Sequence, residues 1–127
     1  MKKEDVKFLY CPHCGNIATK LYDSGVDIVC CGEEMVELEI KTSDTGVEKH
    51  LPKVERVGDQ LKVTVGEVEH PMTDEHFIQW IEVVQDNHVE RFHLKPGDKP
   101  AATFCAKGEA DVYSYCNLHG LWRTSVK

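Results

Sequence analysis

The chain has 127 residues, which is enough for one medium domain or for a small module attached to a larger core. Apolar residues make up 41% of the chain and charged residues 29%, and no apolar run approaches the roughly 20 residues that cross a bilayer, so we expect a globular protein that does not enter a membrane. The formal net charge of −7 argues against nucleic-acid binding, which needs clustered Lys and Arg side chains.

The first ten residues, MKKEDVKFLY, contain no apolar stretch and no small-residue cleavage site of the kind that secretory signals carry. We therefore expect a cytoplasmic location. In a reducing compartment the six cysteines are better interpreted as metal ligands than as disulfides. They fall into two groups, four in the first quarter of the chain and two near its end, and this division predicts two modules.

The first cysteine group follows the spacing CxxC-x15-CC and consists of Cys11, Cys14, Cys30 and Cys31. Four thiolates form a soft tetrahedral donor set that selects zinc or iron and excludes hard ions such as magnesium. Residue types alone do not choose between zinc and iron. Between the first two cysteines, His13 is interpreted as a solvent-facing spacer, because four thiolates already fill the shell. Residues 1–37 are too few to fold around an apolar core, so the metal is expected to supply much of their stability.

Residues 38–44 are expected to form a connector to a second module, residues 45–127. In that module short segments alternate with a period of two, as β-strands do. The segments are Leu61-Val63-Val65, Phe77-Gln79-Ile81-Val83, Val89-Arg91-His93, Val112-Ser114-Cys116 and Leu121-Arg123-Ser125. The turn formers between apolar runs are Gly58-Asp59, Asp86-Asn87, Pro96-Gly97-Asp98 and Lys107-Gly108. This spacing favours an antiparallel β-sandwich, with a barrel as the alternative.

The second module also holds six of the seven histidines, and three neighbourhoods among them are suggestive. These neighbourhoods are Glu48-Lys49-His50, His70-Pro71-Met72-Thr73-Asp74-Glu75-His76 and Cys116-Asn117-Leu118-His119. A CxxH pair at a strand end can clamp a metal, because the turn places thiolate and imidazole on the same side of the chain. Each neighbourhood alone is a weak signal, since a single histidine in a β-domain is more often structural than a ligand.

The remaining candidates have plainer interpretations. His88 follows a predicted hairpin turn and His93 lies on an alternating segment, so both are expected at the surface or behind the ligands. Cys105 is interpreted as a small buried hydrophobe. Trp80 and Trp122 are expected in the core or in the wall of a pocket.

The N-terminal spacing resembles that of desulforedoxin, a small iron module with CxxC followed by vicinal cysteines. With the three histidine neighbourhoods and the segment Cys116-Asn117-Leu118-His119-Gly120-Leu121-Trp122, almost the whole chain resembles the desulfoferrodoxin family of two-iron superoxide reductases. The resemblance implies a mainly β fold, with a rubredoxin-like or desulforedoxin-like iron module joined to a seven-stranded immunoglobulin-like sandwich. It also implies one iron at the four cysteines and a second iron with an axial cysteine and one open position. The implied ligands of the second iron are His50, His70, His76, His119 and, axially, Cys116.

The activity implied by the resemblance is the one-electron reduction of superoxide to hydrogen peroxide, with electrons from rubredoxin or a flavin reductase. A homodimer formed through the small module is implied as well. An acidic chain repels superoxide, so capture needs a local positive field, and Lys49 is the residue implied to supply it. Glu48 is implied to bind the ferric iron after turnover.

Charge counting from the two ligand sets gives a direction to the electron. Four thiolates leave a ferric ion with net charge −1, whereas four imidazoles and one thiolate leave a ferrous ion with net charge +1. Since net charge helps to set reduction potential, an electron arriving at the thiolate site can run downhill to the histidine site. Two alternatives stay open: a pure electron carrier, and a zinc-ribbon interaction module with structural histidines.

Overall fold

The described part of the chain is built almost entirely from β-strands, and in this computed structural model it comprises residues 1–43, 50–66 and 69–127. One turn of 3-10 helix, η1 (Lys3–Asp5), precedes the strands. The N-terminal strands are β1 (Leu9–Tyr10), β2 (Ile17–Ala18), β3 (Val29–Cys30), β4 (Glu33–Glu34), β5 (Val36–Glu37) and β6 (Ile40–Lys41). The strands that follow are β7 (Pro52–Val57), β8 (Gln60–Val65), β9 (Ile78–Gln85), β10 (His88–His93), β11 (Ala101–Cys105), β12 (Ala110–Cys116) and β13 (Gly120–Val126).

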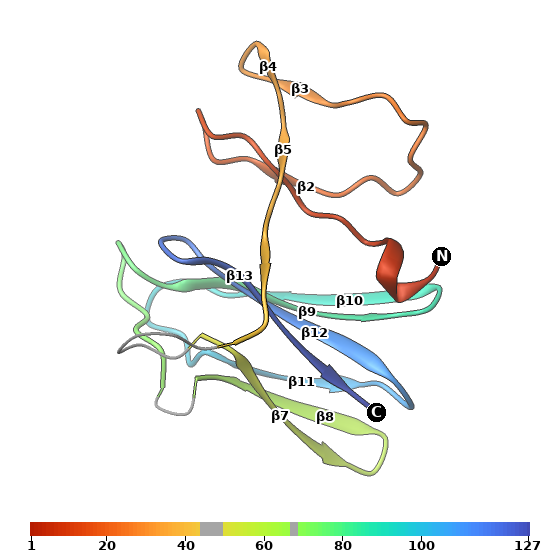
Figure 1. The fold of residues 1–127 in the computed structure, drawn as a ribbon. Helices are drawn as coiled ribbons and strands as arrows, with labels where there is room; N and C mark the ends of the chain where they lie inside the picture. The colour runs from red at the N-terminus through yellow and green to blue at the C-terminus, as the bar shows by residue number, and fades with distance from the viewer. Residues whose placement is uncertain (44–49, 67–68) are drawn as a thin grey trace.

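The N-terminal strands form two small antiparallel units, a sheet in the order β2-β1-β5 and the hairpin β3-β4 (Figure 1). Each of these strands has only two residues, so their ladders contribute few hydrogen bonds. We call residues 1–38 the N-terminal part. Its described strands cannot enclose a core of their own.

Strands β7 to β13 form a sandwich of two sheets, one in the order β10-β9-β12-β13-β6 and the other in the order β11-β8-β7. Apart from β6, seven antiparallel strands make up the sandwich, as predicted for an immunoglobulin-like fold. The two sheets stay separate among the described residues, so the sandwich holds and the barrel alternative does not.

The core between the sheets follows from the alternation along the strands. On β8 the side chains of Leu61, Val63 and Val65 are buried, whereas the intervening positions face outward. They pack against residues of the opposite sheet such as Ile81 and Val112. Burial of this apolar face holds the sandwich together without any metal.

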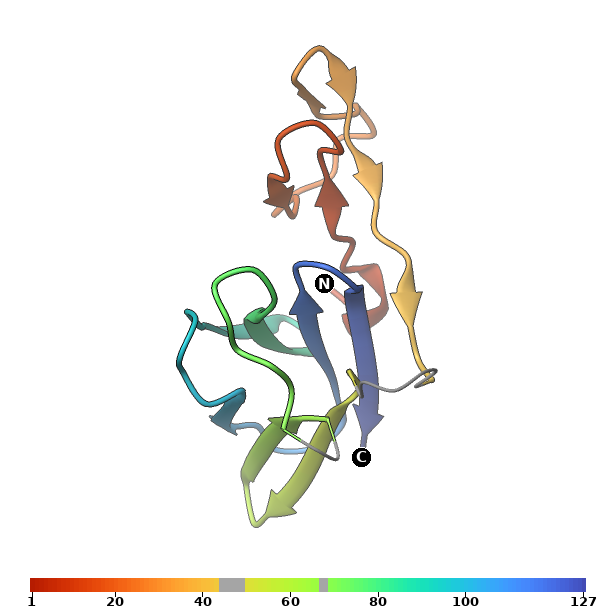
Figure 2. The same cartoon turned by 90° about the vertical axis from the view of Figure 1, so that its left-hand side faces the viewer.

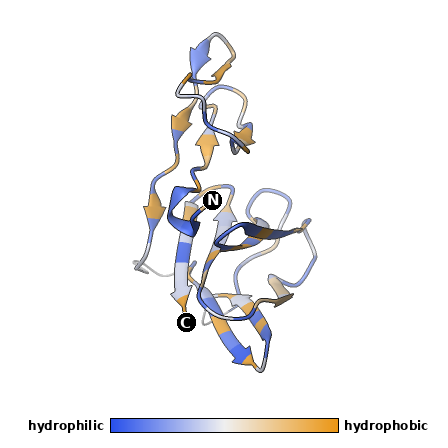
Figure 3. Cartoon of the chain, turned by 90° about the vertical axis from the view of Figure 1, so that its right-hand side faces the viewer, coloured by the Kyte–Doolittle hydropathy of each residue, from blue (hydrophilic) through white to orange (hydrophobic). Residues whose placement is uncertain are grey.

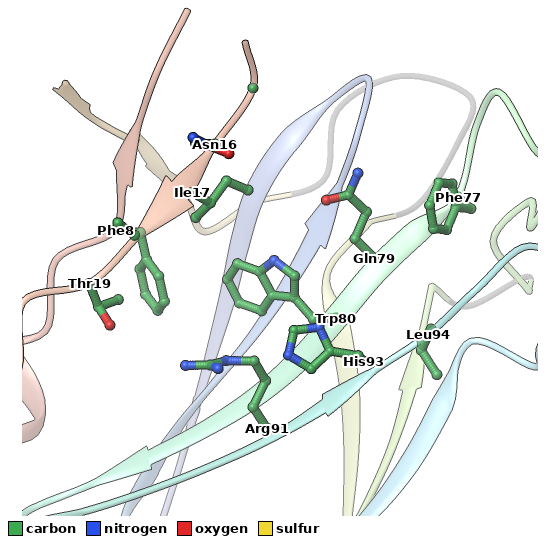
Figure 4. Close-up of a pocket in the computed structure, with 12 residues that line it drawn as sticks. Phe8, Asn16, Ile17, Thr19, Phe77, Gln79, Trp80, Arg91, His93 and Leu94 are labelled. Carbon is green, nitrogen blue, oxygen red and sulfur yellow. The ribbon is translucent and has the colours of Figure 1, made fainter. Parts of the chain in front are cut away.

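Strand β12 is buried on both faces because the N-terminal part covers its outer side. Val112 belongs to the core between the sheets, whereas Tyr113 belongs to a second cluster with Phe8. The Phe8 ring stacks on Trp80 at a centroid distance of 5.2 Å and lies 5.0 Å from the ring of Tyr113. Beside this contact is a pocket of about 450 Å³, lined by Phe8 and Ile17 from one side and by Trp80 and Arg91 from the other (Figure 4).

A single extended segment carries the chain from the N-terminal part to the sandwich, and it runs beside β13 (Figure 2). The N–H of Leu38 donates to the carbonyl of Phe8 at 2.8 Å, and β6 then pairs in parallel with β13. The predicted connector therefore contains a strand of the larger sheet.

The predicted alternating segments lie in strands except for Phe77, which precedes β9 by one residue, and the predicted turn formers all lie between strands. The sequence did not reveal β7 or β11. One prediction is wrong: Cys105 is exposed, because Phe104 and Ala106 take the buried positions of this edge and the alternation turns Cys105 outward. Among the described residues, no helix has the length and apolar character to cross a bilayer.

Candidate metal centres

The four N-terminal cysteines converge into one group, in which all sulfur atoms lie within 4.8 Å of one another. Cys11 and Cys14 follow β1, and the N–H of Gly15 donates to the carbonyl of Cys11 at 2.9 Å, which closes the first knuckle. The Sγ atoms of Cys14 and Cys30 are 3.5 Å apart. Four thiolates at this spacing can surround one ion.

The vicinal cysteines reach the same point because of the turn between β3 and β4. Cys30 pairs with Glu33, which leaves Cys31 and Gly32 as the two turn residues. Both have positive φ, 53° at Cys31 and 78° at Gly32, as in the tight hairpin turns of this length. The left-handed backbone at Cys31 therefore lets two adjacent cysteines reach the same group.

The thiols of this group cannot all ionise together without a cation. Backbone N–H groups, first that of Cys14, stabilise the thiolate of Cys11 and lower its pKa to about 6. Hydrogen bonding among the sulfurs, first with Cys14, raises the pKa of Cys31 to about 12. A bound metal ion would stabilise all four thiolates, because its positive charge attracts each of them. Metal binding here is therefore coupled to proton release.

The second group gathers around the end of β12. Ligand atoms of His50, His70, His76 and Cys116 all lie within 4.8 Å of one another. His119 joins them, since its Nδ1 atom is 3.1 Å from Nε2 of His50 and 3.7 Å from Sγ of Cys116. Metal–nitrogen bonds of about 2.1 Å put neighbouring nitrogens of a square at about 3.0 Å, so the 3.1 Å separation fits one shared ion.

The four imidazoles close into a ring around a common centre. Going from His50 to His70, His76, His119 and back to His50, successive ring centroids are 4.8, 4.8, 5.0 and 4.8 Å apart. The planes meet edge to face, at 63°, 84°, 70° and 66°. The four imidazoles and the sulfur of Cys116 would hold one metal ion between them. The donor set of four imidazoles and one thiolate suits a transition metal such as iron.

The β12–β13 hairpin sets the positions of Cys116 and His119. Cys116 pairs with Gly120 across the hairpin, and Gly120 has a φ of +87°, which only glycine adopts readily. The pairing of β12 with β9 shifts between Tyr115 and Cys116, and such bulges redirect a side chain at a strand end. The predicted CxxH turn is therefore present, with both side chains in the group.

A loop before β9 supplies His76, and Asn117 holds that loop in place. Its Oδ1 atom accepts a hydrogen bond from the N–H of Phe77 at 2.9 Å, and its Nδ2 atom donates to the carbonyl of Glu75 at 2.9 Å. His76 is bracketed by these two bonds. Sequence analysis named Asn117 only as part of the segment that follows Cys116, and it did not predict these two hydrogen bonds.

Hydrogen bonds behind the ring orient two further histidines. Nδ1 of His70 lies 2.7 Å from the carbonyl of Pro71, which can only accept, so the proton is on Nδ1 and Nε2 is left with a lone pair. Ser114, buried on β12, donates to the carbonyl of His50 at 3.0 Å. Trp122 stacks on His50 with centroids 4.8 Å apart and planes at 13°, which makes Trp122 the wall of the site.

Burial divides the second group. Cys116 is fully buried, and His50 and His70 are buried, whereas His76 is half-buried and His119 is exposed. The site therefore sits at one end of the sandwich, with the thiolate and the imidazoles of His50 and His70 inside and those of His76 and His119 reaching the surface.

The remaining predicted residues lie outside these two groups. Glu48 and Lys49 are outside the described residues. His13 is exposed, with its Nε2 atom 3.0 Å from a carboxylate oxygen of Glu33, as expected for a spacer. His88 and His93 are exposed on β10.

A β-sandwich with a five-ligand group of this kind, preceded by a four-thiolate group, defines the class of two-site non-haem iron proteins. The sequence profile described as Desulfoferrodoxin matches residues 42–125. The chain belongs to the desulfoferrodoxin family. Its group of four cysteines and its group of four histidines with one cysteine match the two iron sites of that family, and its cofactors are two iron ions.

Similar proteins extend the match to the N-terminal part. The desulfoferrodoxin of Nitratidesulfovibrio vulgaris is 50% identical over 117 residues, which cover 91% of this chain and 93% of that protein. A superoxide reductase of Pyrococcus horikoshii is 36% identical over 113 residues, covering 73% of this chain and 98% of its own length. The crystal structure of the superoxide reductase from Treponema pallidum matches with a TM-score of 0.77 at 29% identity, over 94% of this chain and 98% of that chain.

Proposed function

We propose that the chain is a superoxide reductase, in which one superoxide takes up one electron and two protons and leaves as one hydrogen peroxide. The observation that carries the proposal is the closed ring of four imidazoles with the sulfur of Cys116 beside it. The broader class, an oxidoreductase, is supported by relatives and solved structures named superoxide reductase. The electron comes from the ferrous iron and is restored by a donor, and the protons come from water, so no dioxygen is released.

In this proposal each group of ligands holds one iron ion. The first ion is held by Cys11, Cys14, Cys30 and Cys31. The second is held by His50, His70, His76, Cys116 and His119. Iron at the second site supplies the electron and a binding position for the anion. The protein keeps the thiolate dry, sets the lone pair of His70 toward the centre, and leaves His76 and His119 near the surface where a small anion can arrive.

Lys49 and Glu48 have roles in the proposal through their position next to His50. The ammonium group of Lys49 attracts superoxide to a protein of net charge −7, and the carboxylate of Glu48 would be a further ligand for the oxidised iron. Both roles are supported by the position of His50, the next residue in the chain, which is buried and belongs to the ring of imidazoles.

The N-terminal part is proposed to be the electron entry and the dimer contact. Cys14 and Cys31 are exposed, which gives a donor such as rubredoxin or a flavin reductase access to the first centre. Exposed apolar side chains in this part could pack against a second copy, and apolar strands there are visible in Figure 3. The exposed large apolar side chains of this part are Met1, Leu21, Tyr22, Val26, Ile28, Val29 and Val36. Apolar patches that are exposed on a single chain often mark a surface that another protein covers.

We further propose modules at residues 1–37 and 45–127 with a connector at 38–44, and a cytoplasmic location. The end of β5 at Glu37 supports the first boundary. Cysteines that gather into two candidate metal centres support a reducing compartment, where thiolates stay available to metal ions.

The test combines metal analysis with the stoichiometry of the reaction. The full chain should contain two irons, and the ferrous histidine site should be oxidised by superoxide with one hydrogen peroxide formed per superoxide. Dismutation would form one peroxide per two superoxides and release dioxygen. Replacement of His119 by Ala should abolish the reaction, whereas His88→Ala, which removes an exposed histidine elsewhere, should not. One zinc per chain, or ferrous iron that superoxide leaves unchanged, would refute the proposal.

The role of Lys49 has its own test. The Lys49→Ile variant should keep both irons but react with superoxide more slowly and with a weaker dependence on ionic strength. Lys107→Ile, with the same change of net charge at the other end of β12, is the matched control. An unchanged second-order rate constant for Lys49→Ile would exclude electrostatic attraction by this residue.

A further inference from the structure

Lys41 lies against the second centre although no motif pointed to it. It is the last residue of β6, and it pairs in parallel with Trp122 of β13. Figure 2 shows this segment running alongside β13 at the edge of the sandwich. The side chain of Lys41 is half-buried, so it is held more firmly than an ordinary surface lysine.

Two contacts tie the ammonium group of Lys41 to the site. Its Nζ atom donates to the carbonyl of His119 at 2.9 Å, the same carbonyl that accepts from Nε1 of Trp122 at 3.2 Å. It also lies 5.1 Å from the centroid of the Trp122 ring, which is a cation–π distance. A Cβ atom at Gly120 would lie 3.8 Å from Nζ, an ordinary van der Waals contact, so the ammonium group lies close to this turn.

The positive charge of Lys41 therefore lies close to the imidazoles of His50 and His119, on the side of Trp122. Trp122 separates Nζ from His50, and the backbone of His119 separates it from the imidazole of His119. Within the described residues no carboxylate lies at ion-pair distance from this ammonium group to compensate its charge. The indole ring also keeps bulk water away from the space between the charge and His50, which weakens screening.

We propose that Lys41 is a positioning and charge-tuning residue of the five-ligand site: it fixes the backbone of His119 and adds a permanent positive charge that favours the ferrous state. The physical reason is the difference in net charge, since the ligands leave the ferrous site at +1 and the ferric site at +2. A fixed positive charge nearby destabilises the ferric form more than the ferrous form. The inference deepens the proposed function, because the ferrous form is the one that reduces superoxide.

Three variants separate the charge of Lys41 from its hydrogen bond, all in the full chain loaded with iron. Lys41→Arg keeps the charge, Lys41→Gln keeps a donor without the charge, and Lys41→Met removes both. Lys107→Met is the control, because it makes the same change in net charge at the far end of β12, nine residues before Cys116. The measured quantity is the ferric-to-ferrous ratio of the histidine site at a fixed ambient potential, read from its absorption spectrum.

For Lys41→Met and Lys41→Gln, the ratio should rise at least about threefold, the effect expected of one partly screened charge. Lys41→Arg and Lys107→Met should stay within about twofold of the unsubstituted protein, and the four-cysteine site should not change in any variant. The proposal is overturned if Lys41→Gln behaves as the unsubstituted chain, because the carbonyl contact alone would then explain Lys41. Equal shifts in Lys107→Met, or no shift at all, would also overturn it.

The measurement distinguishes this inference from the proposed function. If no variant, nor the unsubstituted protein, forms peroxide from superoxide while the ratio shifts as expected, then the proposed reaction fails and the role of Lys41 stands. If peroxide forms normally and the ratio does not shift, then the proposed reaction stands and the role of Lys41 fails.

Discussion

The two candidate metal centres of this chain rest on opposite kinds of support. The four cysteines of the first are joined by strands of two residues, and two of the cysteines are exposed. The second is attached to strands of six to eight residues, and its thiolate, Cys116, is fully buried at the end of β12. We infer that metal binding stabilises the fold around the first centre. At the second centre the folded sandwich already holds the ligands in position.

Metal removal tests this difference between the two centres, and we expect its effect to be the largest. A strong chelator should unfold the N-terminal part, because its two-residue strands cannot enclose a core and the metal–thiolate bonds that join them would be lost. The sandwich should remain folded, because its core needs no metal. Hydrogen exchange should show lost protection at residues 8–37 and retained protection on β8, β9 and β12.

Readdition of ferrous iron under reducing conditions is the control, and it should restore protection in the N-terminal part. Loss of protection across the whole chain at one chelator concentration would contradict the comparison. The two regions would then form one cooperative unit.

Phe8 is the most buried apolar contact of the N-terminal part with the sandwich, and its removal should weaken the docking of the two regions. The ring is buried between Trp80 and Tyr113, so Phe8→Ala should cost about 3–5 kcal/mol of the free energy that docks the N-terminal part. Both irons should stay bound. Urea unfolding followed separately at the two iron absorption bands should show the thiolate band lost first.

Phe92→Ala is the matched control, because Phe92 is 45% exposed on the neighbouring strand β10. It should leave the two transitions close together. If Phe8→Ala leaves them unchanged as well, the docking contact carries little of the stability.

Two asparagines allow the centres to be perturbed one at a time. Asn117→Ala removes both hydrogen bonds that bracket His76 and should cost about 1–3 kcal/mol. Asn16→Ala removes the donor to Sγ of Cys30, a longer bond of 3.5 Å at the surface, and should cost less. The absorption spectrum should change only at the histidine site for Asn117→Ala and only at the thiolate site for Asn16→Ala. A change at both sites in either variant would mean that the centres are coupled through the fold.

The local pattern of the sequence could predict the sandwich but not what covers it. A period of two along Leu61, Val63 and Val65 shows which face is buried, and it needs no knowledge of distant residues. The same pattern on β12 predicts one buried face, yet Tyr113 on the other face is also buried, because Phe8 from the start of the chain packs on it. Long-range covering of this kind leaves no periodic signal.

The candidate site divides in the same way. Spacing and resemblance named all nine side chains that the structure gathers into the two groups. They did not reveal the clamp of Asn117 or the contact of Lys41, since both depend on which backbone carbonyls and N–H groups come within reach after folding. Cys105 was misjudged because a strand as short as β11 allows either register, and only the burial of Phe104 decides it. Glu48 and Lys49 stay predictions.

The smallest expected effect concerns Glu82, a buried carboxylate on the sheet face that the N-terminal part covers. Burial raises its pKa above the ordinary value of 4.5, against the opposing influence of the Arg91 guanidinium, whose Nε donates to it. Because the folded state then holds a proton that the unfolded state has released, stability should fall as the pH rises from 4.5 through the folded pKa, and level off above it.

Glu82→Gln keeps an acceptor for Arg91 and removes the titration, so the variant should lack this part of the pH dependence. Urea midpoints of both proteins, taken at each pH from about 5 to 8, should diverge in favour of the variant as the pH rises. Taking the difference at each pH cancels the titration of the metal ligands, which both proteins share. A parallel pair of curves would mean that Arg91 keeps Glu82 ionised in the fold, and that the sandwich, unlike the thiolate centre, has no stability linked to a proton at this position.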